Sequence, residues 1–202
     1  MATVGANAVT NGQLNVPDRS DRTGAHVVTD GHGRYQEAVL QGRVFYAANV
    51  SVATTSVGLS TTYTGLSLAN PVGSGVNMVL LYATLMQSVI QSTQVEAYAI
   101  ATGYNATTNV THTTPVTPRS ALVGTSTTPN GLADSSSTLP TAPFYTMFLT
   151  QTQIVAGNAG TVIADLGGSI ILAPGAYAAF VTPAQASVAG LWFSFTWEEV
   201  SQ

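Results

Sequence analysis

The sequence contains no cysteine and no lysine. Without cysteine there are no disulfide bonds, no thiolate metal sites and no cysteine nucleophile. Without lysine there is no glycine-rich phosphate loop of the kind that ends in that residue. The G-x-S-x-G motif of serine hydrolases is also missing, and the nearest match, residues 73–75 (Gly-Ser-Gly), is better interpreted as a turn. These absences remove the most recognisable catalytic motifs.

Charge of either sign is scarce. Charged residues make up 7% of the 202 residues, against about 25% in an ordinary soluble domain. Hydrophobic residues make up 45%, which is enough to build a core. The polar surface must therefore come from Thr, Ser, Asn, Gln and Gly, which can be buried in a contact at lower desolvation cost than charges. We expect a surface that neighbouring subunits cover, with an unusual but isolated soluble β domain as the alternative.

The few charges are unevenly distributed, with a net charge of −4. Residues 1–43 hold four of the five arginines, and no basic cluster occurs after them. Binding to nucleic acid needs several clustered cations, so nucleic acid is not expected as a main partner. Residues 1–43 are rich in Gly and Asn and lack periodicity, which predicts an extended arm with a short helix at residues 36–40. A plain flexible tail is the alternative.

Signals for a membrane or for export are missing as well. The most apolar run, residues 76–90, is shorter than the roughly 20 residues of a spanning helix and contains Asn, Thr, Gln and Ser. The first 22 residues have neither a basic region nor an apolar core of a signal peptide. We therefore expect a protein that is made in a host cytoplasm and has no membrane partner.

What is present is alternation of apolar residues with period two, which begins after Arg43 and predicts strands. In residues 44–52 the apolar positions include Val44, Tyr46 and Ala48. The run at residues 76–90 fits both a helix and a strand buried on two faces, and we favour a strand because its neighbours are strands. Further strands are predicted at residues 61–68, 95–104, 120–124, 144–151, 161–166, 169–172, 176–182 and 191–200.

Two of these strands, residues 169–172 and 176–182, are predicted to flank a tight turn at Pro174-Gly175. Residues 105–143 hold five of the nine prolines and, apart from 120–124, predict a long surface loop. About eight or nine strands, not counting the short one at residues 120–124, and no long helix predict a single all-β domain at residues 44–202. The expected architecture is an antiparallel, jelly-roll-like sandwich with an extended N-terminal arm at residues 1–43.

Two stretches resemble a recurring type of tailed-bacteriophage virion protein. They are NPVGSGVNMVLL at residues 70–81 and, nearer the C-terminus, GGSIILAPGAYAAFVTPA followed by FSFTWEEV. In that type, an apolar strand follows an Asn-Pro-x-Gly-Ser-Gly turn, and a Pro-Gly turn and an aromatic strand close the domain. The resemblance covers residues 43–200. It implies a jelly-roll virion component, such as a trimeric head decoration (cement) protein, and implies no active site.

Metal binding and acid catalysis find little support in the residues. His26, Asp30 and His32 have ligand chemistry, but their glycine-rich surroundings offer no scaffold to orient them. We expect these side chains to be solvated, and we expect no metal and no cofactor. Glu198 and Glu199 are the only adjacent carboxylates, and neighbours on a strand point to opposite faces. We therefore expect no enzymatic activity.

The two tryptophans have different expected environments. Trp197 shares a strand face with Phe193 and Phe195, which predicts that it lies in the core. Trp192 points the other way, where an exposed indole serves as an interface anchor or as part of a sugar site. We favour the interface.

Composition and resemblance together predict a non-enzymatic phage structural protein located in the virion. We expect a capsid decoration protein that stabilises the particle by binding copies of itself, as a homotrimer, and the major capsid protein or another virion protein. Arg19, Arg22, Arg34 and Arg43 are expected to pair with acidic groups of a partner. The alternative is a tail or fibre module that binds host-surface glycan through residues 105–143.

Overall fold

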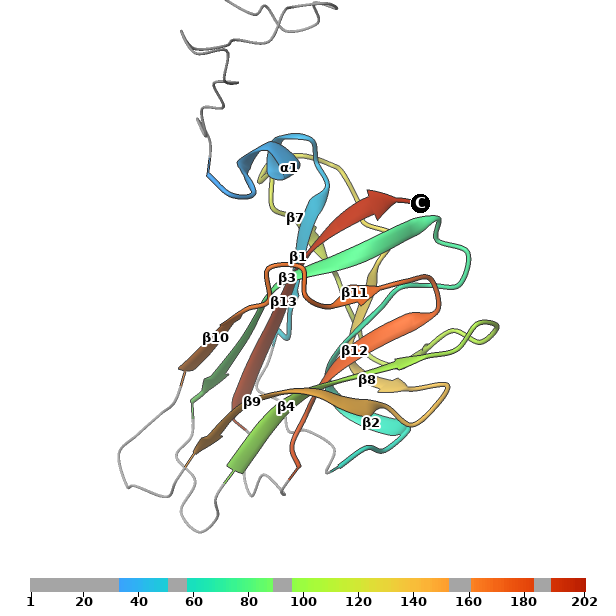
Figure 1. Ribbon diagram of the computed structural model, residues 1–202, viewed down its shortest axis with the longest axis vertical. Helices are drawn as coiled ribbons and strands as arrows, with labels where there is room; N and C mark the ends of the chain where they lie inside the picture. The colour runs from blue at the N-terminus through green and yellow to red at the C-terminus, as the bar shows by residue number, and fades with distance from the viewer. Residues whose placement is uncertain (1–32, 51–57, 89–95, 153–160, 184–189) are drawn as a thin grey trace, which may run out of the picture. The chain divides into compact units, whose positions relative to one another are not determined.

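The computed structural model describes residues 33–50, 58–88, 96–152, 161–183 and 190–202 (Figure 1). Nearly all of the regular structure is β, and the helix expected at residues 36–40 is present as α1 (Gln36–Leu40). A compact unit spans Ala38–Gln202. It begins before residue 44 because the Arg43 carbonyl accepts a hydrogen bond from the Glu199 amide (2.8 Å) and so already belongs to a sheet. No helix in the described part of the chain is long and apolar enough to cross a membrane.

The strands form two antiparallel sheets. Sheet I has the order β10 (Thr161–Asp165), β3 (Val76–Gln87), β13 (Leu191–Ser201), β1 (Val44–Ala48), β7 (Arg119–Ser120), and β11 (Ile171–Leu172) also pairs with β3. Sheet II has the order β5 (Thr111–His112), β8 (Leu132–Thr138), β2 (Thr62–Ala69), β12 (Ala176–Val181), β4 (Glu96–Tyr104), β9 (Phe144–Thr152), and β6 (Pro115–Val116) also pairs with β8. The prediction of an all-β antiparallel sandwich is confirmed.

The main core lies between the two sheets. The strand β13 supplies four side chains that are at most 2% exposed, because its apolar residues alternate with residues of the outer face. Phe180 of β12 stacks on two of them, Phe193 and Phe195, with ring centroids 4.6 and 4.5 Å apart. Trp197 is fully buried in this core, as predicted.

A second, smaller core covers the outer face of sheet II. The connection between β8 and β9, residues 139–143, has to cross over β2, β12 and β4, which separate the two strands. Along the way the Leu139 amide donates to the Thr61 carbonyl (2.8 Å), and the Thr141 hydroxyl lies 3.1 Å from that of Tyr177. The buried members of this covered face are Tyr63, Ala69, Ala99, Ala101, Val110, Leu139, Tyr177, Ala179 and Val181.

Most predicted strands are present with ends shifted by one or two residues, and β13 ends at Ser201, one residue beyond its predicted end. The ambiguous run at residues 76–90 is a strand over Val76–Gln87, as favoured, and its last two residues lie outside the described ranges. The predicted strand at residues 120–124 is wrong, since β7 ends at Ser120. The long loop predicted over residues 105–143 is also wrong, because β5, β6, β7 and β8 lie within it.

The turn at Pro174-Gly175 does not join two paired strands. Instead β11 pairs with β3 in sheet I, whereas β12 pairs with β2 and β4 in sheet II, so the chain changes sheets there. Gly175 makes this crossing with φ of 88°. A Cβ at this position would lie 2.3 Å from the carbonyl oxygen of Asn105, so only glycine fits.

In β1, the alternate residues that face the core are not the set that the apolar positions suggest. Phe45 and Ala47 are buried in the core, whereas Tyr46 and Ala48 are exposed on the outer face of sheet I. Val44 is buried as well. Because both sets of residues in this strand are apolar, period two fixed the strand but not its buried face.

Candidate functional site

Trp192 lies on the outer face of sheet I, opposite the core, as predicted. It is half-buried, and its indole Nε1 donates a hydrogen bond to the Ser88 hydroxyl (3.3 Å). Beside it is a hollow of about 380 Å³, here called the Trp192 hollow. Its lining comes from β10, β3, β13, β1 and the residue after β1, and consists of Ala48, Asn49, Thr84, Leu85, Met86, Thr161, Ile163, Trp192, Phe193 and Ser194.

None of the described residues that line the Trp192 hollow has a charged side chain. Met86 and Ile163 are 44% and 70% exposed there. The polar groups largely satisfy one another, since the Thr84 and Ser194 hydroxyls lie 2.5 Å apart. The Asn49 side chain accepts from the Phe193 amide (2.6 Å) and donates to the Leu191 carbonyl (3.1 Å). The hollow therefore suits an uncharged, mainly apolar group.

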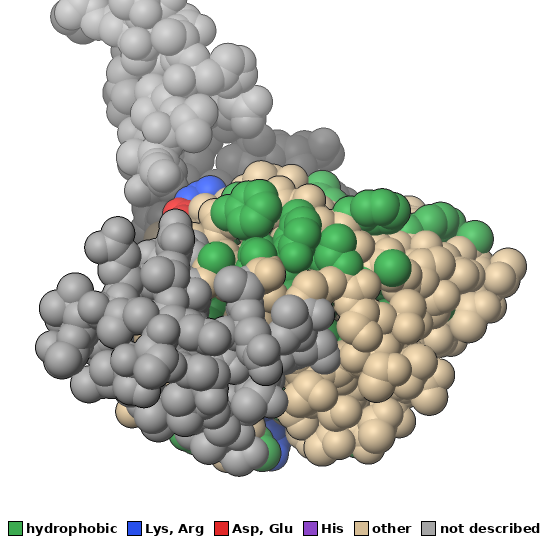
Figure 2. All heavy atoms as spheres, turned by 90° about the horizontal axis from the view of Figure 1, so that it is seen from below, with side chains coloured by type: hydrophobic (Ala, Val, Ile, Leu, Met, Phe, Trp, Pro, Cys, Tyr) green, Lys and Arg blue, Asp and Glu red, His purple; other side chains and the backbone are tan. Residues whose placement is uncertain are grey.

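Exposed aromatic side chains form a second apolar feature at the β9 edge of sheet II. Phe144 and Phe148 are 73% and 69% exposed, and the rings of Tyr145 and Phe148 lie 5.4 Å apart. Figure 2 shows hydrophobic side chains gathered on one side of a surface with very few charges. An aromatic edge of this kind adds apolar area that contact with another molecule would bury.

Two of the four predicted partner-binding arginines are described. The Arg34 guanidinium lies over the Tyr35 ring, 5.0 Å from its centroid. Arg43 Nη1 forms an ion pair of 2.6 Å with Glu198 of the same chain, so its charge is already partly matched. Outside the described residues lie Arg19, Arg22, His26, Asp30 and His32.

The adjacent carboxylates at the end of β13 have separate structural roles. Glu198 pairs with Arg43. Glu199 is buried and accepts hydrogen bonds from the Asn130 amide (3.0 Å), the Gly131 amide (2.8 Å) and the Trp197 indole (3.3 Å). As expected from their positions on a strand, the two side chains serve different faces, and Glu199 fastens residues 130–131 to sheet I.

A buried carboxylate and an imidazole meet on sheet II. Asp134 of β8 has a side chain that is 1% exposed, and its Oδ2 is hydrogen-bonded to Nδ1 of His112 on β5. Burial raises the pKa of the Asp134 carboxyl, and the contact with His112 opposes that rise. The pair holds the imidazole ring in a fixed orientation.

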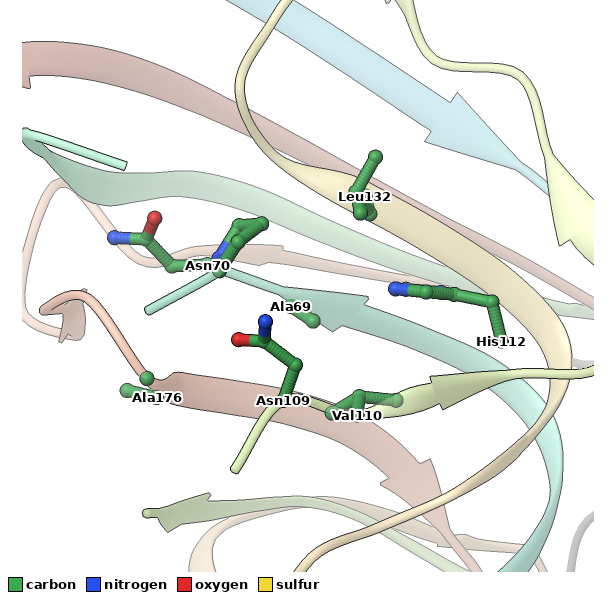
Figure 3. Close-up of a pocket in the computed structure, with 9 residues that line it drawn as sticks. Ala69, Asn70, Asn109, Val110, His112, Leu132 and Ala176 are labelled. Carbon is green, nitrogen blue, oxygen red and sulfur yellow. The ribbon is translucent and has the colours of Figure 1, made fainter. Parts of the chain in front are cut away.

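His112 forms one wall of a small pocket of about 140 Å³, here called the His112 pocket. Figure 3 shows His112 and Asn109 extending into the same space. The Asn109 Oδ1 accepts from the Val72 amide (2.7 Å). The remaining lining is mainly apolar and consists of Ala69, Asn70, Pro71, Val110, Leu132, Gly175 and Ala176.

The His112 pocket combines two side chains that can form hydrogen bonds with apolar walls. None of the described residues in its lining is Ser, Thr, Asp or Glu, and the nearby Ser137 hydroxyl pairs with that of Ser67 (3.0 Å). In the described ranges, no three residues of the His, Asp and Glu types cluster closely enough to hold a metal ion. Hydrogen-bonding groups on apolar walls are what the pocket offers a ligand.

Sequence reasoning missed the His112–Asp134 pair and Asn109. The two members of the pair are 22 positions apart in the chain, on two short strands within a stretch that was predicted to be a loop. No spacing rule connects them, because antiparallel pairing of β5 with β8 brings them together. The one available signal was that a histidine and an aspartate occur in a segment with few other charges.

Comparisons with protein-family models, with curated protein sequences and with solved structures find no match to this chain.

Proposed function

We propose that this chain is a non-enzymatic structural protein of a phage virion, a capsid decoration (cement) protein that stabilises the particle through contacts between subunits. The observation that carries the proposal is the Trp192 hollow, a depression on the outer face of sheet I whose described lining is uncharged and mainly apolar. The virion assignment rests on the resemblance of residues 43–200. The partners are other copies of the chain, in a homotrimer, and the major capsid protein or another virion protein.

Removing water from this face costs little free energy, because its lining is uncharged. Burying a charged rim costs several kcal/mol per ion when the geometry is imperfect, and the hollow has no such group. A tryptophan in a depression is a frequent centre of binding energy. Only 7% of all residues are charged, so a low desolvation cost is expected for the rest of the surface as well.

The first test is the mass of the purified protein by light scattering at several concentrations. A stable species near three times 20.8 kDa supports a preassembled trimer. Trp192→Ala should weaken self-association or particle binding by about tenfold to a hundredfold. Val123→Ala is the matched control, since Val123 is 86% exposed and does not line the hollow. Equal assembly of all three proteins, or a clean monomer that binds no particle, would contradict the proposal.

A second candidate function is a tail or fibre module that binds host-surface glycan. The observation that favours it is that Asn109, Val110, His112 and Leu132, which line the His112 pocket, all belong to residues 105–143. A glycan array tests it: specific hits that disappear when these side chains are replaced support glycan binding, and an array without hits contradicts it.

A further inference from the structure

The His112 pocket has the size of a small functional group. Its volume is about 140 Å³, and a cavity of about 150 Å³ is enough to hold a benzene-sized ligand. A group of four or five heavy atoms therefore fits, whereas a whole hexose ring does not. The apolar part of the lining comes from Ala69, Pro71, Val110, Leu132 and Ala176, so part of the group should be apolar.

The orientation of the imidazole determines whether His112 presents a hydrogen-bond donor or an acceptor to this group. Its Nδ1 faces the buried carboxylate of Asp134. With the carboxylate ionised and the ring neutral, the proton lies on Nδ1, and Nε2 carries a free lone pair. The ring extends into the pocket (Figure 3), so His112 presents a hydrogen-bond acceptor there.

Asn109 offers the complementary group. Its Oδ1 is held by the Val72 amide (2.7 Å), which fixes the carboxamide and leaves the Nδ2 hydrogens for the pocket. Figure 3 shows this nitrogen on the pocket side of the side chain. The pocket thus combines one acceptor, one donor and apolar walls, and no charged side chain belongs to its lining.

We propose that the His112 pocket binds the acetamido group of an N-acetylated sugar. The amide N–H donates to His112 Nε2, the amide carbonyl accepts from Asn109 Nδ2, and the methyl group packs on the apolar walls. A secondary acetamide supplies this combination in four heavy atoms without charge. The inference rests on the second candidate function, glycan binding, and is independent of the proposed role in assembly.

The neighbouring surface favours a sugar over a peptide side chain as the bearer of this group. Tyr104 is 57% exposed and is paired across the sheet with Ala176, which lines the pocket. An exposed aromatic ring near a pocket that holds the acetamido group suits the apolar face of a pyranose. We therefore place the sugar ring on the Tyr104 side, with its acetamido group directed into the pocket.

The test uses two sugars that differ only at the proposed contact. N-acetylglucosamine and glucose are titrated into the full chain, with binding followed by NMR chemical shifts or calorimetry. We expect binding of N-acetylglucosamine and at least tenfold weaker binding of glucose, because the lost amide leaves two pocket groups unpaired.

Two conservative variants separate binding from folding. Asn109→Asp keeps an oxygen for the Val72 amide and removes the donor. His112→Asn keeps a donor for Asp134 and, because its side chain is shorter, has no acceptor at the position of Nε2. Each should weaken N-acetylglucosamine binding about tenfold, the effect of one hydrogen bond, with the thermal unfolding midpoint of the wild type retained. Wild-type affinity in both folded variants would overturn the proposal.

The possible failures point to different hypotheses. Array hits without N-acetylated sugars would overturn the acetamido proposal and leave glycan binding standing. An array without any hit would overturn both, and the light-scattering assay of assembly would be unaffected. A capped glutamine amide that binds as tightly as N-acetylglucosamine would assign the pocket to a protein side chain and overturn the sugar proposal.

Discussion

The outer faces of the two sheets differ in what covers them. On sheet II the chain itself crosses the face through residues 139–143, and Tyr177 beneath is fully buried. On sheet I, Met86, Ile163 and Trp192 line a hollow on the outer face, which is here called the open face because Met86 and Ile163 are exposed there. The difference appears in the sequence of the central strands. β12 is apolar on both faces, whereas β13 alternates apolar with mostly polar residues.

This contrast teaches that a sheet face with exposed apolar side chains is the place to look for a partner. The covered face has already buried its apolar area within the chain, and further contact adds little there. The open face still has apolar area to bury. Substitutions on the two faces should therefore change the free energy of unfolding by different amounts.

The largest effect is expected on the covered face, from Tyr177→Ala. Removing a fully buried aromatic ring from packed surroundings costs about 3–5 kcal/mol of unfolding free energy. Urea unfolding followed by tryptophan fluorescence measures it. Tyr177→Phe, which loses only the hydroxyl contacts with Thr141, should cost about 1 kcal/mol. A loss below 1 kcal/mol for Tyr177→Ala would mean that the cover is not packed as described.

Gly103→Ala should give the next largest loss. A Cβ at this position would lie 2.2 Å from the Tyr177 hydroxyl oxygen, so the aromatic ring must move. Overpacking of this kind costs about 1–3 kcal/mol. Ala48→Val on the open face adds apolar volume where Ala48 is exposed, and it should cost less than about 0.5 kcal/mol. If urea unfolding showed equal losses of unfolding free energy in the two variants, the proposed difference between the two faces would be wrong.

A smaller effect that depends on pH is expected from Asp134. Burial raises the pKa of this carboxyl above its ordinary value of 3.8, so the folded protein holds the proton more tightly than the unfolded chain. Protonation therefore favours folding, and the wild type should gain stability relative to Asp134→Asn as pH falls from neutral, with the gain complete below pH 3.8. Urea unfolding of both proteins across this range measures the difference, and a relative loss of wild-type stability on acidification would contradict it.

The smallest effect on unfolding is expected from Trp192→Ala. Its indole lies on the open face, so the monomer should lose less than about 0.5 kcal/mol, although assembly should weaken. Dilute samples isolate the monomer, and unfolding midpoints at several protein concentrations separate the two effects. A large loss in the dilute monomer would show that the hollow is part of the core.

Much of the fold was accessible to sequence reasoning because one face of many strands is buried. Residues 191–197 alternate cleanly, and the structure places Trp197 inside and Trp192 outside, as predicted. The strand β8 was missed because LADSSST contains few apolar or β-branched residues. Its buried positions include Asp134 and Ser137, whose burial is tolerated because His112 and Ser67 bond to them.

The sites were less accessible than the strands. The exposure of Trp192 followed from alternation, but the hollow beside it depends on β10, which pairs with β3 from a distant part of the sequence. The tight turn at Pro174-Gly175 was predicted, but the change of sheets there was not, because a Pro-Gly pair marks a change of direction without specifying which sheet follows. The His112 pocket depends on pairing between β5 and β8, neither of which was predicted.

The position of β13 has a consequence for how the protein is made. β13 follows the other described strands of sheet I in chain order, yet it lies between β3 and β1 in the middle of the sheet. A ribosome releases β1 and β3 long before their shared neighbour exists, so each has an unpaired edge while synthesis continues. Sheet I is completed only after residue 201 has left the exit tunnel. Stalling or truncation before this point would leave a nascent chain with open apolar edges, which makes it a substrate for chaperones and prone to aggregation.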